Sequence, residues 1–150
     1  MVRRDDDGEW LNAAIELSRL CLPSDSAFSV GAILVSADRE VVATGYSRET
    51  DPKDHAEEVA LARAGDSVLA GATLYSSLEP CLARTSRPVA CAELVARSGV
   101  RRVVIAWREP PVFQPGGGAA WLEKQGIEVV ELPEFADAAR AVNWQLLDPR

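Results

Sequence analysis

Residues 72–107 read ATLYSSLEPCLARTSRPVACAELVARSGVRRVVIAW, and this stretch decides the fold. Residues 72–77 predict a short strand, and the apolar run within residues 101–107 predicts a buried one. Between them, Pro88 suits the first turn of a helix that stops at Gly99. A strand, a helix and a second strand in succession indicate a right-handed crossover between parallel strands.

The segments on either side extend this alternation. The sequence predicts helices over residues 9–22, 55–64, 88–98, 118–125 and 134–147, and strands over residues 30–36, 40–46, 72–77, 101–107 and 127–131. The first two strands form a hairpin, and Asp54 is the expected N-cap of the second helix. We therefore expect one α/β domain over residues 1–150, a mixed five-stranded sheet between two helix layers, with residues 1–8 flexible.

The composition is typical of a soluble globular protein and argues against several classes of function. The chain is 47% hydrophobic and 26% charged, with a net charge of −7 at pH 7. Nucleic-acid binding needs a basic footprint, which this acidic balance does not provide. The sequence has no run of about 18 apolar residues for a membrane span, and its acidic start lacks the apolar core of a secretory signal. We expect a cytoplasmic protein with no nucleic-acid or membrane partner.

One histidine and two cysteines, His55, Cys81 and Cys91, form the ligand set of a zinc site. Three protein ligands leave the fourth tetrahedral position open, as in catalytic sites, where zinc activates water near neutral pH. Glu57 is the candidate for moving protons between that water and a substrate. Positions 55 and 57 cannot share one side of a helix, but from its first turn both side chains can reach the space beyond its N-terminus.

These residues also have purely structural interpretations. Glu57 lies three residues after Asp54 and can close a capping box with it. Cysteines are often buried as small hydrophobic residues, an interpretation that fits Cys21, on the apolar face of the first predicted helix, best. A nucleophilic Cys81 is a further alternative, although no Cys-x-x-Cys pair supports redox chemistry. The joint occurrence of the motifs at helix starts favours the metal site.

The His-Ala-Glu at residues 55–57 and the Pro-Cys at residues 80–81 resemble the zinc-dependent cytidine and deoxycytidylate deaminase superfamily. The nine residues from Leu82 to Ala90 separate the two cysteines, where the common motif has two. Residues 77–91 resemble, with one extra residue, the longer insert of the riboflavin-pathway deaminase domain. The resemblance extends over roughly residues 10–131 and includes the predicted strands and the later joints between helix and strand.

The resemblance implies a cytidine deaminase-like fold, one zinc ion per chain and hydrolytic release of ammonia from an aminopyrimidine-type heterocycle. It also implies a homodimer or homotetramer. The riboflavin-pathway enzyme often continues into a reductase domain, and because this sequence ends at Arg150 we expect any reductase to be a separate protein. Backbone groups from Ser77 to Pro80 are expected to contact the leaving amine. The candidate substrate contacts are Ala27, Phe28, Ser77, Glu79 and Arg84.

Some of these candidates bear on the substrate. Ala27 stands where the family usually has an asparagine that holds a ribose, which weakens the case for a ribosyl substrate. Phe28 can stack on a ring or plug the start of a strand. Arg84 and Arg87 can bind a phosphate or acid group, or act as exposed loop residues. Trp107 can line the pocket or pack in the core or an interface.

Other functions remain open at the level of sequence. Within the superfamily, the alternatives are a cytosine or cytidine deaminase and a specialised, antibiotic-type nucleoside or free-base deaminase. A tRNA adenosine deaminase shares the motif, but its substrate requires a basic surface. Outside the enzymes, a zinc-stabilised binding domain would keep the three ligands but would not need Glu57.

Overall fold

The computed structural model describes residues 3–147, and five strands form a single mixed sheet in the order β2-β1-β3-β4-β5. The strands are β1 (Gly31–Val35), β2 (Val41–Tyr46), β3 (Thr73–Ser76), β4 (Arg102–Ile105) and β5 (Glu128–Glu131). β1 runs antiparallel to both β2 and β3, whereas β3, β4 and β5 are parallel to one another. This is the predicted hairpin followed by crossovers.

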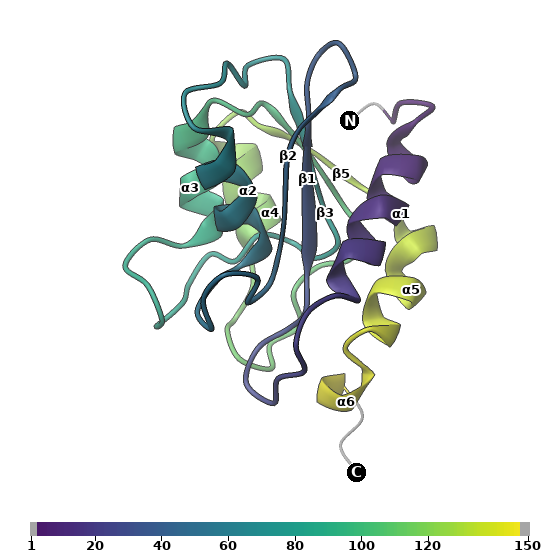
Figure 1. Ribbon diagram of the computed structural model, residues 1–150, viewed down its shortest axis with the longest axis vertical. Helices are drawn as coiled ribbons and strands as arrows, with labels where there is room; N and C mark the ends of the chain where they lie inside the picture. Colours follow the sequence, from purple (N-terminus) through teal and green to yellow (C-terminus); the bar gives the residue numbers. More distant parts are fainter. Residues whose placement is uncertain (1–2, 148–150) are drawn as a thin grey trace.

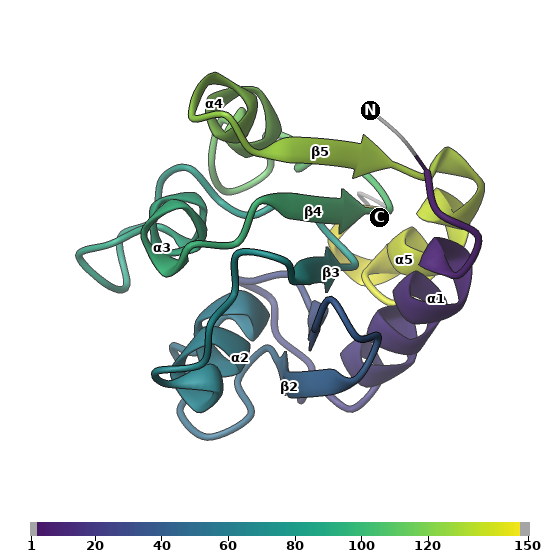
Figure 2. The same cartoon turned by 90° about the horizontal axis from the view of Figure 1, so that it is seen from above.

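Helices cover both faces of the sheet, as Figures 1 and 2 show. One layer contains α2 (Ala56–Ala64), α3 (Cys91–Ser98) and α4 (Gly118–Lys124), and the other contains α1 (Asp7–Ser18) and α5 (Ala136–Ala141). The predicted three-layer α/β/α fold is confirmed. No helix within residues 3–147 is both long and apolar enough to cross a membrane.

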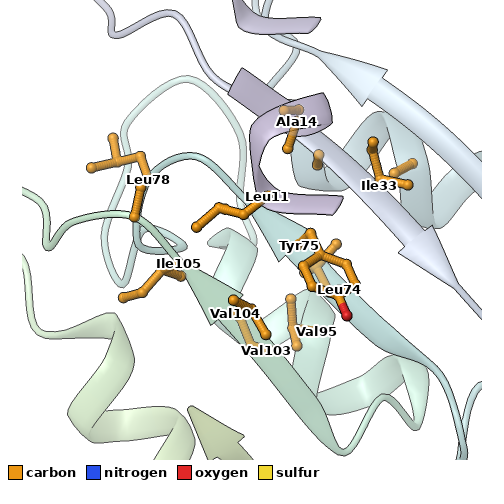
Figure 3. Packing of buried hydrophobic residues seen from close by; sticks show 14 of the residues in the cluster. Leu11, Ala14, Ile33, Leu74, Tyr75, Leu78, Val95, Val103, Val104 and Ile105 are labelled. Atoms are coloured by element: carbon orange, nitrogen blue, oxygen red, sulfur yellow. The ribbon is translucent and has the colours of Figure 1, made fainter. Parts of the chain in front are cut away.

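The core lies on both faces of the three central strands. Every residue of β1, β3 and β4 is buried, because helices pack on either side of them, whereas the edge strand β2 is only partly buried. Figure 3 shows buried residues from both layers, with Leu11 from α1 and Val95 from α3, together with strand residues such as Val103. This rigid framework holds the loops at the carboxyl ends of β3 and β4.

The first helix starts earlier and ends earlier than residues 9–22. Asp7 and Gly8 belong to α1 rather than to the flexible segment 1–8 expected from the sequence, and residues 1–2 lie outside the described part. The reason is the side chain of Asp7, which is buried and accepts a hydrogen bond from the backbone N–H of Arg4. The third helix, in contrast, begins later than predicted, at Cys91, three residues after Pro88.

The predicted C-terminal helix 134–147 is divided into three pieces. A short 3-10 helix, η1 (Pro133–Phe135), precedes α5, and α6 (Trp144–Leu147) follows it. The break between α5 and α6 includes Asn143, whose side-chain amide accepts a hydrogen bond from Ser29 N–H and donates one to Ser29 C=O. These tertiary hydrogen bonds fix the chain at Asn143 and interrupt the helix there. Helical periodicity does not contain this information, and it therefore predicts a single continuous helix.

Candidate metal centre and active-site cavity

Three segments that are distant in the sequence bring His55, Cys81 and Cys91 together. His55 is the N-cap of α2, Cys91 is the first residue of α3, and Cys81 lies in the loop that follows β3. His55 Nδ1 lies 3.4 Å from Cys91 Sγ and 3.6 Å from Cys81 Sγ. All three atoms lie within 4.8 Å of one another, so one metal ion can contact each of them.

The spacing of these atoms fits zinc. Typical zinc–sulfur and zinc–nitrogen bonds in a tetrahedral site place a nitrogen and a sulfur ligand about 3.6 Å apart. Both distances from His55 Nδ1 agree with that value. The donor set of one imidazole and two thiols suits zinc, and three protein ligands leave a fourth position for water or substrate.

The electrostatic surroundings of the two thiols also favour the binding of a cation. The hydrogen bond from Cys91 lowers the pKa of the Cys81 thiol to about 4, whereas the pKa of Cys91 is raised because the two sulfurs share one negative charge. The backbone N–H of Cys91 points at Cys81 Sγ at 3.3 Å, and Arg84 Nη1 lies 3.8 Å from Cys91 Sγ. A divalent ion would allow both sulfurs to bind as thiolates.

The N-terminus of α2 differs from the prediction by one residue, and the difference matters for Glu57. The N-cap is His55 instead of Asp54, and Glu58 accepts the hydrogen bond from His55 N–H at 2.8 Å. Asp54 instead accepts hydrogen bonds from Thr50 and from the backbone N–H of Asp51. Glu58 therefore closes the capping box, and the structural alternative for Glu57 is removed.

Glu57 is buried beside the three candidate metal ligands and faces a cavity. Its exposed fraction is 3%, and it is one of the residues that line a cavity of about 370 Å³. Burial, reinforced by the negative charge of Cys81, raises the pKa of Glu57 to about 7. A carboxyl group with a pKa near neutrality can both accept and donate a proton at physiological pH.

The cavity has an aromatic wall. Ala27, Phe28 and Phe113 line it, and the Phe28 ring meets the edges of Phe113 and Trp107 at centroid distances of 5.1 Å and 5.8 Å. Trp107 is buried behind this wall, with the guanidinium of Arg140 5.3 Å from the centroid of its ring. Trp107 thus supports Phe28, and the wall provides an apolar surface for a flat ring.

Three predicted substrate contacts have structural tasks. Ser77 does not line the cavity, because its hydroxyl accepts a hydrogen bond from the N–H of Gly31 at 3.1 Å within the fold. Glu79 lines the cavity, yet its two oxygens accept hydrogen bonds from the N–H groups of Glu109 and Ala119. Arg84 also lines the cavity, and its buried guanidinium pairs with Glu58 and donates to the carbonyl of Lys53.

Arg87 is directed away from the cavity. It pairs with Asp51, Asp54 and Glu58 on the outer side of α2 and is not among the cavity-lining residues. Because its acidic neighbours already compensate its charge, Arg87 serves to attach the loop between the two cysteines to α2.

Sequence reasoning missed Glu109 and Phe113, which reach the cavity from the loop after β4. Burial and the negative charges of Cys81, Glu57 and Glu79 raise the pKa of Glu109 to about 8. A glutamate in a loop rich in proline and glycine suggests a solvated residue. Its place just beyond the carboxyl end of a parallel strand was the available signal, because ligands of α/β sheets bind there.

Comparison with known proteins agrees with this geometry. The family model of the cytidine and deoxycytidylate deaminase zinc-binding region matches residues 4–107. A diaminohydroxyphosphoribosylamino-pyrimidine deaminase of Schizosaccharomyces pombe is 40% identical over 134 residues, which cover 86% of this chain and 33% of the relative. The riboflavin biosynthesis protein RibD of Aquifex aeolicus is 42% identical over 115 residues, 77% of this chain and 31% of the relative. The chain thus spans about a third of the length of these relatives.

Solved structures have the same fold. RibD of Acinetobacter baumannii superimposes with a TM-score of 0.76 at 32% identity, over 95% of this chain and 39% of that one. The Rib2 deaminase of Aspergillus oryzae, as a C-terminal deletion mutant, gives a TM-score of 0.75 over 94% of this chain and 96% of its own. At 22% identity, this second likeness supports the fold alone.

Proposed function

The chain belongs to the zinc-binding cytidine and deoxycytidylate deaminase family, and we propose that it hydrolytically deaminates an amino-substituted pyrimidine. In this reaction, the oxygen of water bonds to the ring carbon that carries the exocyclic amine. The carbon–nitrogen bond then breaks, ammonia leaves and a ring carbonyl remains. The observation that carries the proposal is the buried Glu57 carboxyl beside the three ligand atoms, at the wall of a cavity large enough for one heterocycle.

The residues of the site divide this chemistry between them. His55, Cys81 and Cys91 would hold zinc, which supplies a Lewis acid that activates water at neutral pH. Glu57 takes a proton from the attacking water, delivers it to a ring nitrogen and then transfers a second proton to the departing amine. Its raised pKa suits both directions of transfer. A zinc-stabilised binding domain would have no use for a buried acid at this place.

Within the family, a riboflavin-type substrate is favoured. The fission-yeast relative is named for a diaminohydroxyphosphoribosylamino-pyrimidine, and its likeness covers 86% of this chain. The loop between the cysteines supports the same branch, because Arg84 and Arg87 attach this longer insert to α2. Since both arginines are paired with acids, a substrate phosphate would instead meet Lys53, which also lines the cavity.

One observation favours a second candidate, a free-base or specialised nucleoside deaminase. Ala27 lines the cavity where the family usually places a ribose-binding asparagine, and a methyl group cannot make that hydrogen bond. Such a bond contributes about 0.5–1.5 kcal/mol, so its loss weakens ribose recognition without abolishing it. The free base therefore ranks below the phosphorylated pyrimidine.

The setting of the enzyme is part of the proposal. We expect a homodimer or homotetramer in the cytoplasm, where reducing conditions keep the cysteine ligands as thiols. Exposed apolar side chains, among them Leu22, Val68 and Trp144, offer surface for contacts between subunits.

A comparison of substrates tests the proposed function. The zinc content of the purified chain is measured first, and ammonia release is then followed with a free aminopyrimidine, its nucleoside and its 5′-phosphate. We expect about one zinc per chain and the highest kcat/KM for the 5′-phosphate. The highest value for the free base would support the second candidate instead. A chain that binds zinc and releases no ammonia from any of the three would contradict the assignment as a deaminase.

A further inference from the structure

Glu109 is a carboxyl group of the cavity that neither the metal ligands nor the proton transfers use. Its backbone is held firmly, because the N–H of Glu109 donates to one oxygen of Glu79 at 2.8 Å. The other oxygen of Glu79 accepts from Ala119 N–H at 2.7 Å. Next to Ala119, Gly118 approaches the carbonyl of Pro80 so closely that a Cβ atom there would lie 1.9 Å from the oxygen. These contacts fix the Glu109 loop against the segment that carries the cysteine ligand Cys81.

The side chain of Glu109 lacks the partners that its backbone has. Glu109 lines the same cavity as Glu57, and its Oε1 atom is buried without a hydrogen-bond partner among the described residues. A buried acceptor without a partner destabilises a fold, and native proteins keep one mainly where a ligand or an ordered water satisfies it. Because its backbone is fixed and its Oε1 atom has no partner, Glu109 is positioned to accept a hydrogen bond from a ligand in the cavity.

The charges around Glu109 indicate which kind of ligand group can bind there. Glu109 lies close enough to Glu57 and Glu79 for their negative charges to act on it. Of the arginines that line this cavity, Arg84 is already paired with Glu58, and Arg48 donates to the carbonyls of Leu22 and Phe28. An anionic group such as a phosphate would be repelled at this end, whereas an N–H donor would be attracted.

We propose that Glu109 is a specificity-determining residue whose carboxyl oxygen accepts a hydrogen bond from a second amino group of the substrate, one that is not lost in the reaction. The inference rests on the proposed deaminase function and extends it from the reacting carbon to the rest of the ring. Glu109 selects rings with several amino groups over rings that carry only the leaving one. Above the pKa of about 8, where Glu109 is a carboxylate, such a hydrogen bond corresponds to about 10- to 100-fold in affinity.

A binding cycle tests the role of Glu109 separately from catalysis. The zinc-loaded chain with Glu57→Gln, which is expected to bind without turnover, is titrated calorimetrically at pH 9, above the pKa of Glu109, with two free bases. These are 2-amino-4-hydroxypyrimidine, which carries one amino group, and 2,4,5-triamino-6-hydroxypyrimidine, which carries three. The same titrations are repeated after adding Glu109→Ala, and after adding Glu123→Gln as a control on the exposed face of α4.

We expect the parent to bind the triamino base at least about tenfold more tightly than the monoamino base. Glu109→Ala should reduce this ratio to within about twofold, and Glu123→Gln should preserve it. A ratio that stays unchanged in Glu109→Ala would overturn the inference, as would a parent with no preference. If Glu109→Ala does not fold, as judged by zinc content and Tm, the isosteric Glu109→Gln replaces it. That variant should lower the ratio at least about threefold, because it removes the charge of the acceptor.

Failure of the inference can be told apart from failure of the proposed function. Ammonia release by the chain with Glu57 intact tests the function, and the affinity ratio tests Glu109. Ammonia release together with a ratio that is insensitive to Glu109 would leave the deaminase in place and overturn the specificity role. A ratio that depends on Glu109 without ammonia release from any pyrimidine would support the role in recognition and contradict the reaction.

Discussion

Asp7 and Glu57 are both buried carboxyl groups, and their surroundings shift their pKa values in opposite directions. Burial raises the pKa of Asp7, but hydrogen bonds from Arg102, from Arg4 N–H and from the Tyr75 hydroxyl outweigh it and lower the pKa to about 2. Burial also raises the pKa of Glu57, and the negative charge of Cys81 raises it further, to about 7. Burial alone therefore does not decide the charge of a group, because its partners do.

The two regions use buried charge for different purposes. Asp7 and Arg102 are joined by hydrogen bonds of 2.6 Å and 2.9 Å and connect α1 to β4, so each charge is compensated within the fold. In the cavity, Glu57 and Glu109 face negative neighbours, and their compensation must come from a metal ion or a substrate. The first arrangement stabilises the native state, and the second is suited to function.

The largest effect is expected from removing a metal ligand. In Cys91→Ser, a hydroxyl replaces a thiolate without a large change in volume, so zinc and deaminase activity should both be lost. Zinc content by mass spectrometry and ammonia release are the measurements. Cys21→Ser is the matched control, because Cys21 lies outside the ligand cluster and should leave the metal in place. Retention of one zinc by Cys91→Ser would contradict the ligand assignment.

The second-largest effect is expected from Glu57→Gln, which tests proton transfer separately from metal binding. Glu57→Gln should lower kcat by about 10²–10⁴-fold, because a placed proton-transfer group is lost. Zinc content and Tm should stay at the values of the parent chain, since the amide has the shape of the carboxyl group and Glu58 forms the capping box. Turnover within a few-fold of the parent would mean that Glu57 is not the proton carrier.

In the other region, a comparable substitution should act on stability. Asp7→Ala removes one of the two acidic partners of the buried Arg102, with Glu128 remaining, and should lower the free energy of unfolding by about 1.5–3 kcal/mol, as measured by urea denaturation. Zinc content and KM should be unaffected in the fraction that remains folded. A change of less than about 1 kcal/mol would show that the ion pair is not important for stability.

The smallest effect is the pH dependence that Asp7 contributes. Its pKa is lowered from 3.8 to about 2 in the folded chain, so the stabilisation is complete above about pH 4 and is lost as the pH falls towards 2. The parent should therefore lose about 2 kcal/mol more than Asp7→Asn between pH 5 and pH 2. Zinc release in acid affects both proteins equally, so the difference between them reports Asp7. Parallel stability curves would contradict this account.

The order of the elements and the candidate metal ligands follow from the sequence. Strand runs and helical periodicity are local patterns, and they predicted the hairpin, the crossovers and the mixed sheet. His55, Cys81 and Cys91 were recognisable as candidate ligands because zinc accepts few kinds of ligand. Pro and capping signals placed His55 and Cys91 near helix starts, to within about three residues of the observed starts.

The tertiary structure alone decided which charged groups are available to a ligand. Arg84 is paired with Glu58, 26 residues away, and Glu79 with the backbone of Glu109, 30 residues away, so neither is free as the sequence suggested. Glu109 reaches the cavity because β4 ends beside the cysteine loop. The charge and reach of a side chain depend on its burial and on partners from distant segments, and local sequence patterns do not contain that information.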